Sequence, residues 1–161
     1  MCFLCYAAAY VARLNLSAAL KSVMENLNLT DAQGGLFQTV FALMYAAGQL
    51  VNGSIVDKIS ARRYITAGLI LSGVCNLLFG LAHSYWLMVV IWALNGASQS
   101  MLWTPIVKLM AVWFKGERRS KASFGLSITL VLGNVSAWAI SGFMASQVGW
   151  RLSFKIGRAH V

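Results

Sequence analysis

The feature that most restricts the fold of this chain is a series of long apolar runs separated by short gaps. A helix that crosses a bilayer needs roughly 20 mostly apolar residues. Runs of about this length occur at residues 3–20, 35–56, 64–82, 85–114 and 122–146. Only 11% of the residues are charged, whereas soluble domains carry roughly 25%. Pattern and composition together predict an all-α, polytopic membrane helix bundle.

Two of these runs contain a residue that is unusual inside a membrane helix. The run at 3–20 is as short as a signal-peptide core, but it lacks a small-residue cleavage site and has Arg13 near its centre. We therefore predict that it is a true span. In the run at 85–114, Pro105 has no backbone donor, and this predicts a kink near Thr104.

The charged residues lie mainly in the gaps, and their distribution predicts the orientation of the chain. Lys and Arg favour the cytoplasmic side of a membrane. Alternate gaps are rich in them, with Lys58, Arg62 and Arg63 in one and Lys115, Arg118, Arg119 and Lys121 in the other. The only basic residues in the intervening gaps are Lys21 and His83. We expect a multi-pass protein of the cell membrane whose N-terminus and loops 57–63 and 115–121 are cytoplasmic.

Other functional classes find little support in the sequence. A net charge of +9 would suggest nucleic acid in a soluble protein, but here the basic residues lie between apolar runs, so we expect no nucleic-acid partner. Cys2 and Cys5 form a C-x-x-C pattern with no His or acidic neighbour, so packing is the simpler interpretation. We find no phosphate loop, nucleophile with a base, or metal cluster, and we expect neither an enzyme nor a cofactor.

The last residues of the sequence read KIGRAHV, which resembles a read-through of a sequencing-library adapter. We expect an N-terminal helix bundle at residues 1–155, with five full spans and the start of a sixth, followed by an adapter-derived scar at 156–161. On this interpretation the chain is a fragment. A genuine polar tail is the alternative.

The gap between the second and third runs has an ordered pattern, GSIVDKISARRY. It contains, in order, Gly53, Asp57, Lys58, Ser60, Arg62 and Arg63. A plain cytoplasmic loop needs the basic residues but not the Gly and the Asp. Gly53 would let a partner helix approach closely, and the Asp57 carboxylate could hold one of the arginines. The pattern resembles the loop between helices 2 and 3 of the major facilitator superfamily, apart from Ser60 in place of the usual Gly. The resemblance implies that Gly53, Asp57, Arg62 and Arg63 form a cytoplasmic gate.

Three further stretches extend this resemblance over residues 3–154. GWRLSF at 149–154 resembles the superfamily's entry to helix 6. LNGASQSMLWTP at 94–105 and YAAAYVARLN at 6–15 resemble helices 4 and 1 of the organophosphate:phosphate antiporter family, with its central Arg at Arg13. The resemblance implies the N-terminal half of a twelve-helix fold. Other basic residues of that family are replaced here, which argues against a doubly charged sugar phosphate. The replacements are Leu14, Gln49 and about Thr129.

Polar residues recur at helical spacing on four of the five runs. The stripes are Tyr6, Tyr10, Arg13 and Ser17; Gln38, Tyr45, Gln49 and Asn52; Asn95, Gln99 and Trp103; and Ser123, Ser127, Asn134, Trp138 and Ser141. The third run offers only Ser72, Cys75 and Asn76. We therefore expect a central cavity lined by the first, second, fourth and fifth spans. For any single Ser, Asn or Gln, helix–helix contact worth about 0.6 kcal/mol is the alternative role.

Arg13 is the residue that points most directly to a ligand. An Arg near the bilayer centre costs roughly 2.5–3.5 kcal/mol on insertion scales, so it should face a cavity or a partner. No run contains an acidic residue, and Asp57 lies just beyond the end of one. An anionic substrate is therefore the simplest partner. We predict no metal site and a substrate site made of Arg13, Tyr6, Tyr10, Gln49, Gln99, Trp103 and Asn134.

These features, with the resemblance, predict a secondary active transporter of a small organic anion, phosphorylated or not, that works by alternating access. Antiport and symport both stay open. A membrane sensor of the same type of ligand is the main alternative, and a structural membrane subunit is a third. The expected partners are the anionic substrate, the lipid bilayer and the missing C-terminal half.

Overall fold

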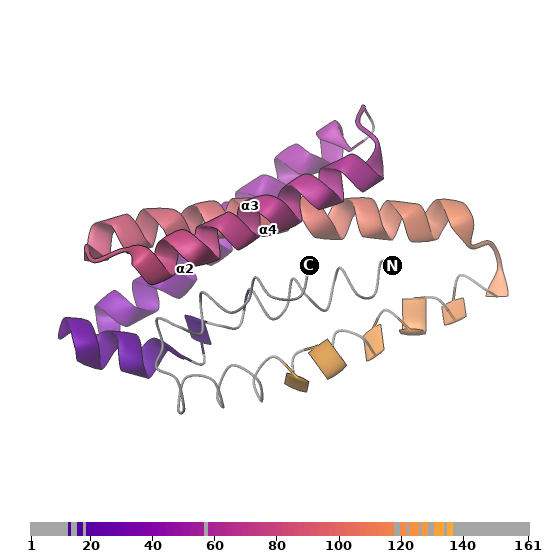
Figure 1. The fold of residues 1–161 in the computed structure, drawn as a ribbon. Coiled ribbons are helices and arrows are strands. Elements are labelled where there is room, and N and C mark those ends of the chain that lie inside the picture. The colour runs from indigo at the N-terminus through magenta and orange to yellow at the C-terminus, as the bar shows by residue number, and fades with distance from the viewer. Residues whose placement is uncertain are drawn as a thin grey trace.

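The computed structural model describes residues 13, 16–17, 19–56, 58–117, 120–121, 123–125, 127–128, 131–133 and 135–136. They include three complete helices, α2 (Asp31–Ile55), α3 (Ala61–Leu81) and α4 (Tyr85–Trp113) (Figure 1). The described residues between 13 and 27 are also helical, and we call them the first helical segment. None of the described residues forms a strand, which confirms the all-α prediction.

The three complete helices lie close to the predicted runs at 35–56, 64–82 and 85–114. The end of the first run was predicted wrongly. Its helix continues to Leu27, so Lys21 lies on a helix and not in a gap. An apolar pattern marks only the part of a helix that suits lipid, and polar turns beyond it escape notice. α4 stays helical through Pro105, and the kink near Thr104 remains a prediction. More than half of the fifth run lies outside the described residues.

A tight turn at residues 28–30 joins the first helical segment to α2. Asn28 has a φ of 50°, the left-handed conformation that commonly ends a helix, and Leu29 N–H donates to the Met24 carbonyl at 3.0 Å. Thr30 then begins α2 with a capping box: Gln33 N–H donates to Thr30 Oγ1 at 3.3 Å, and Thr30 N–H donates to Gln33 Oε1 at 2.9 Å. Local hydrogen bonds therefore fix both ends of this turn.

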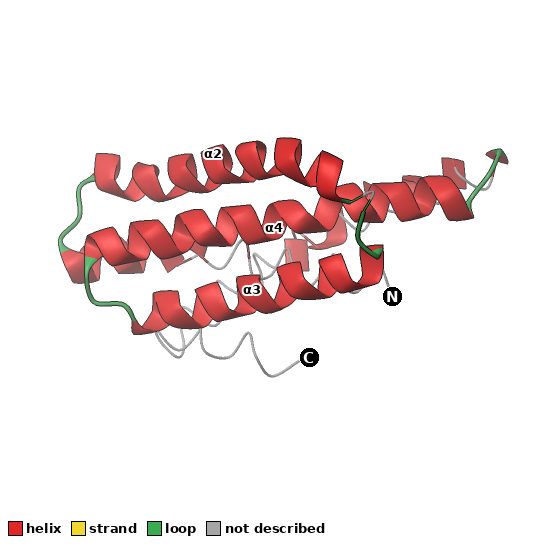
Figure 2. Cartoon of the chain, turned by 90° about the horizontal axis from the view of Figure 1, so that it is seen from above, coloured by secondary structure: helices red, strands yellow, loops and turns green. Residues whose placement is uncertain are grey.

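α4 lies between α2 and α3 and packs against both (Figure 2). The main core cluster joins Leu16, Ala19 and Val23 of the first helical segment to all three helices, and aromatic contacts link α2, α3 and α4 within it. The ring centroids of Phe37 and Phe79 are 5.7 Å apart, and those of Phe79 and Trp92 are 5.1 Å apart. Such tilted and edge-on ring pairs add to the free energy gained from burial. A smaller cluster of Ile65, Leu102, Ile106 and Met110 holds the other end of α3 against α4.

Glycines set how closely the helices approach. A Cβ placed on Gly96 of α4 would lie 2.5 Å from the Phe41 carbonyl oxygen on α2. A Cβ placed on Gly48 of α2 would lie 2.1 Å from Ser100 Oγ on α4. Small residues of this kind let the backbones of membrane helices meet. At Gly96 α4 therefore packs directly on the backbone of α2, and at Gly48 only the small Ser100 side chain lies between the two helices.

The outer surfaces of the described helices are apolar, as contact with lipid requires. Leu50 is 82% exposed and Ile70 is 61% exposed, and both lie within helices. α2 and α3 are each long and apolar enough to cross a membrane by length and composition. α4 is longer, and several of its polar side chains are buried, among them Asn95 and Gln99. The inward faces hold the polar groups that a functional site could use.

Candidate functional site

The guanidinium of Arg13 lies against two aromatic rings of α2. Its central carbon is 5.1 Å from the ring centroids of both Phe41 and Tyr45. These rings stack at 13° to each other, because the two residues are one helical turn apart. A cation at this distance is attracted to the ring faces. Among the residues that the structure describes, no carboxylate pairs with Arg13, so its charge is held by rings and is not neutralised by an acid.

The polar stripes predicted on the first and second runs face each other here. Gln38 Nε2 of α2 donates to Ser17 Oγ at 3.0 Å, one turn along the first helical segment from Arg13. Tyr45, one of the rings at Arg13, belongs to the stripe on α2 as well. The structure therefore brings Arg13 together with the polar face of α2. Phe41 was missed, although it lies one turn before Tyr45 on that face.

Gln49 continues the same face one turn beyond Tyr45. Its Oε1 accepts a hydrogen bond from Thr104 Oγ1 of α4 at 2.7 Å. Its Nε2 is buried and has no hydrogen-bond partner among the residues that the structure describes. Trp103, next to Thr104, is half-buried and packs against the small cluster between α3 and α4. Of these residues, sequence reasoning missed Thr104, whose hydroxyl holds one end of the Gln49 amide.

Gln99 lies in a different part of the structure, between α3 and α4. It is 4% exposed, and its Nε2 donates to Ser72 Oγ at 3.2 Å. Ser72 Oγ in turn donates to Asn95 Oδ1 at 2.7 Å. The structure therefore separates Gln99 from the face that carries Arg13 and Gln49. The predicted residues Tyr6, Tyr10 and Asn134 lie outside the described residues, and the role of all four in binding stays a prediction.

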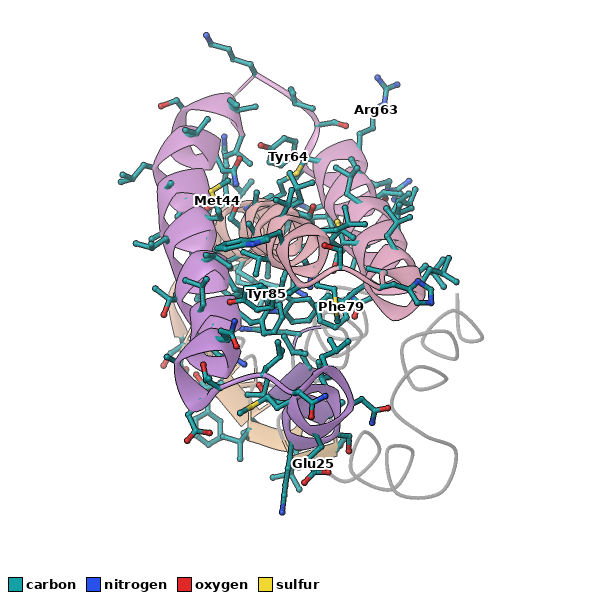
Figure 3. All side chains as sticks on the ribbon, turned by 90° about the vertical axis from the view of Figure 1, so that its left-hand side faces the viewer. Glu25, Met44, Arg63, Tyr64, Phe79 and Tyr85 are labelled. Carbon is teal, nitrogen blue, oxygen red and sulfur yellow. The ribbon has the colours of Figure 1, made fainter. Side chains whose placement is uncertain are left out.

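A buried hydrogen-bond network ties the three helices together near the basic loop at 57–63. Asn52 Nδ2 donates to Ser100 Oγ at 2.7 Å, and Tyr64 Oη donates to Asn52 Oδ1. Tyr64 points from α3 toward α2 (Figure 3). Sequence reasoning placed Asn52 on a polar stripe but missed both partners. A polar side chain at the end of one run facing a Tyr at the start of the next is the signal that could have found them.

The residues predicted to form a cytoplasmic gate lie at the surface. Arg62 and Arg63 are exposed, and Arg63 points away from the helices (Figure 3). Gly53 was expected to allow a close approach, but nothing among the described residues lies within 4 Å of a Cβ placed there. Close approaches between helices are found at Gly48, Gly68 and Gly96 instead. Asp57 lies outside the described residues, so its contact with an arginine stays a prediction.

Comparisons with known proteins give a consistent result. A family model described as the Major Facilitator Superfamily matches residues 2–157. The "Probable hexose phosphate transport protein" of Chlamydia trachomatis is 27% identical over 149 residues, which are 92% of this chain and 33% of that protein. The "Membrane sensor protein UhpC" of Escherichia coli is 29% identical over 154 residues, or 94% of this chain and 34% of that protein.

The "Glucose-6-phosphate exchanger SLC37A2" of Danio rerio is 34% identical over 126 residues, or 74% of this chain and 25% of that protein. This chain thus spans about a third or less of the length of the curated relatives it matches.

Proposed function

The chain belongs to the major facilitator superfamily, and from this premise we propose that it forms the N-terminal half of a secondary active transporter for a small organic anion. The resemblance to the organophosphate:phosphate antiporter family is confirmed by the relatives. The names of these relatives refer to transport or exchange of hexose phosphates, which are small anions. In this proposal the two halves of the protein move against each other around a site near the middle of the membrane.

The observation that supports the proposal most directly is the placement of Arg13. Its guanidinium lies against Phe41 and Tyr45, and no described carboxylate neutralises it. A guanidinium offers donors in a planar fork that fits a carboxylate or phosphate with two parallel bonds. We assign anion binding to Arg13, and we keep Gln49, one turn beyond Tyr45 on α2, and Trp103 in the proposed site. Tyr6, Tyr10, Gln99 and Asn134 remain part of the proposed site.

We assign gating to the basic loop. Gly53, Asp57, Arg62 and Arg63 would contact the other half of the protein when the site faces outward. The open surface beside Gly53 and the exposure of the two arginines leave room for such a partner. The carboxylate of Asp57 would pair with a basic group and hold the loop in one state.

The test of the proposed function is uptake by the complete reading frame that contains this chain. The protein is purified and reconstituted into liposomes loaded with inorganic phosphate or with buffer. We expect a radiolabelled hexose 6-phosphate, hexose 6-sulfate or monocarboxylate to accumulate in the liposomes. Protein-free liposomes give the background. Absence of accumulation for every anion, with or without internal phosphate, would contradict transport.

A membrane sensor of the same type of ligand is the second candidate. It is favoured by one observation, the similarity over 94% of this chain to a protein named as a membrane sensor. A sensor would bind an anion without moving it. Binding measured by calorimetry, together with no uptake into liposomes, would favour this alternative.

The proposed orientation gives a separate prediction. Single cysteines are introduced at Ser60, Ser84 and Glu117 after the native cysteines are replaced by Ala. Ser60 and Ser84 are exposed loop positions, and Glu117 is preferred to its neighbour Gly116, whose φ of +57° would strain a Cys. We expect an impermeant thiol reagent to label Ser84→Cys in intact cells, and the other two only after the membrane is opened. Labelling of Ser60→Cys in intact cells would reverse the orientation.

A further inference from the structure

A buried polar cluster lies between α3 and α4, whereas Arg13 lies against α2. Ser72 of α3 is at its centre and is 1% exposed. The Ser72 hydroxyl donates to Asn95 Oδ1 at 2.7 Å and accepts from Gln99 Nε2 at 3.2 Å. The Ser72 carbonyl accepts from Asn76 Nδ2 at 2.9 Å. One serine therefore holds three amide side chains, two from α4 and one from its own helix.

Two atoms of this cluster have no hydrogen-bond partner among the described residues. They are Asn95 Nδ2 and Asn76 Oδ1, and both are buried. Asn95 as a whole is 0% exposed and Asn76 is 6% exposed. Buried polar atoms in native proteins are nearly always paired with protein or with ordered water, so these two need an explanation.

The hydrogen bonds to Ser72 determine which atom of each amide is left over. The oxygen and nitrogen of an amide are assigned from networks of this kind. If the Asn95 amide were turned over, the Ser72 hydroxyl would face two donors and would lose its acceptor. If the Asn76 amide were turned over, its oxygen would face the Ser72 carbonyl oxygen. The cluster therefore presents one free donor, Asn95 Nδ2, and one free acceptor, Asn76 Oδ1.

The spacing of the two asparagines suits one small molecule between them. Asn95 is level with Ser72, since the two side chains are bonded. Asn76 is one turn further along α3, or about 6 Å at about 1.5 Å per residue. A molecule that accepts one hydrogen bond and donates another, each at about 2.8–2.9 Å, reaches across a gap of this size.

The packing on either side of the asparagines differs. On one side α3 and α4 are in close contact, because a Cβ placed on Gly68 would lie 3.0 Å from the Ser98 carbonyl oxygen. On the other side the rings of Phe79 and Trp92 lie between the helices, with centroids 5.1 Å apart. Bulky rings hold the helix axes further apart than a glycine contact does. The asparagines thus lie where the seam between α3 and α4 begins to widen.

The place of the cluster in the membrane excludes a charged occupant. Ser72 is about 13–17 Å from either end of α3, at about 1.5 Å per residue, so it lies near the middle of the bilayer. The charged residues of α3 and α4 are Arg62, Arg63 and Lys108, and each is about 13 Å or more away along its helix. An ion here would have no counter-ion and would be strongly disfavoured. A neutral molecule with one acceptor and one donor is the chemistry that fits.

We propose that α3 and α4 bind one water molecule near the middle of the membrane. The water accepts a hydrogen bond from Asn95 Nδ2 and donates one to Asn76 Oδ1, and so it bridges the two helices. Buried waters typically have such otherwise unpaired polar groups as partners. This site is separate from the contact of Arg13 with α2, and it does not depend on the proposed function.

X-ray radiolysis detects a water that is buried in a protein. The beam converts water to hydroxyl radicals, which oxidise the side chains beside the place where they form. The complete reading frame is purified, placed in lipid nanodiscs and irradiated, and mass spectrometry gives the oxidised fraction of each tryptophan. Trp92 is one turn from Asn95 and 1% exposed, whereas Trp86 and Trp113 are 68% and 79% exposed and report on radicals from outside. We expect Trp92 to be oxidised in the wild type, because the radicals arise next to it.

Two variants each remove one partner of the water. Asn76→Leu removes the acceptor and Asn95→Leu removes the donor. In both, oxidation of Trp92 relative to Trp86 and Trp113 should fall about fivefold or more, because the water loses a hydrogen bond. Asn26→Leu is the matched control. Asn26 Nδ2 donates to the Ser22 carbonyl at 2.9 Å, as Asn76 Nδ2 does to that of Ser72, but Asn26 is exposed, so its loss should leave oxidation of Trp92 unchanged.

Three results would overturn the inference. These are no oxidation of Trp92 in the folded wild type, equal oxidation in the wild type and the two seam variants, or an equal fall in Asn26→Leu. Thermal unfolding shows whether each variant is folded, and if one is not, the wild type and the other variant decide. None of these results bears on anion transport, so the proposed function is tested separately.

Discussion

Arg13→Ala is expected to abolish anion binding, and Arg13→Lys is expected to weaken it about tenfold or more. Hydrogen bonds to charged groups contribute about 1.5–3 kcal/mol each, and Lys replaces a two-bonded fork by a point charge. The ring faces of Phe41 and Tyr45 hold the guanidinium in place in the free protein. Neither Ala nor Lys at position 13 can place a planar, two-pronged donor against these rings.

Ligand titration by calorimetry, on protein from the complete reading frame, measures this effect. Lys21→Ala is a suitable control, because it removes an exposed positive charge from the same helix. The rival hypothesis is that Arg13 only pairs with an acidic residue elsewhere in the protein. In that case Arg13→Lys would leave the anion affinity almost unchanged, and Arg13→Ala would lower the unfolding temperature. Unchanged anion affinity in Arg13→Lys would end the binding hypothesis.

Gly96→Leu should destabilise the helix bundle more than any other single change considered in this half. Even its Cβ would lie 2.5 Å from the Phe41 carbonyl oxygen and 3.1 Å from Phe41 Cα, and backbone atoms cannot turn aside as a side chain can. Overpacking a well-packed contact typically costs about 1–3 kcal/mol, and a Leu adds three carbons beyond the Cβ. α2 and α4 must therefore move apart, which also displaces the Phe41 ring from Arg13.

Thermal unfolding of the purified protein in detergent tests this prediction, with anion affinity measured in parallel. Gly73→Leu is the matched control, since Gly73 lies inside α3 and no described residue lies within 4 Å of its added Cβ. We expect a clear fall in the unfolding temperature for Gly96→Leu and little change for Gly73→Leu. Equal unfolding temperatures for the two variants would show that the contact at Phe41 is not close in the protein.

Much of the fold could be predicted because membrane spans leave a strong signal. The apolar runs gave α2, α3 and α4 to within a few residues. The end of the first helix was missed because a different signal determines it. Asn28 takes the left-handed conformation and Thr30 begins a capping box with Gln33, and neither is visible in hydropathy. The turn could have been predicted from its polar residues, but not from the apolar pattern alone.

The candidate site was harder to predict, because periodicity identifies a face of a helix but not the neighbour of that face. The stripe of Arg13 and Ser17 does meet the stripe of Gln38 and Tyr45. Gln99 instead bonds to Ser72, since α4 lies between two helices and has two inward faces. The same limit applies to glycines. Gly53 and Gly96 look alike in the sequence, and only the arrangement of the helices shows which one permits a close contact.

The short turn at residues 28–30 also has a consequence for the order of assembly during synthesis. It lets the first helical segment and α2 pair as a hairpin, with Ser17 bonded to Gln38 and Arg13 against Phe41 and Tyr45. Each of these contacts involves only residues up to 45, so the hairpin has all it needs to form them before α3 and α4 have left the ribosome. A guanidinium that is costly to expose to lipid is thus covered by its own hairpin at the first stage of insertion. The later helices are then added to a pair in which this charge is already sheltered.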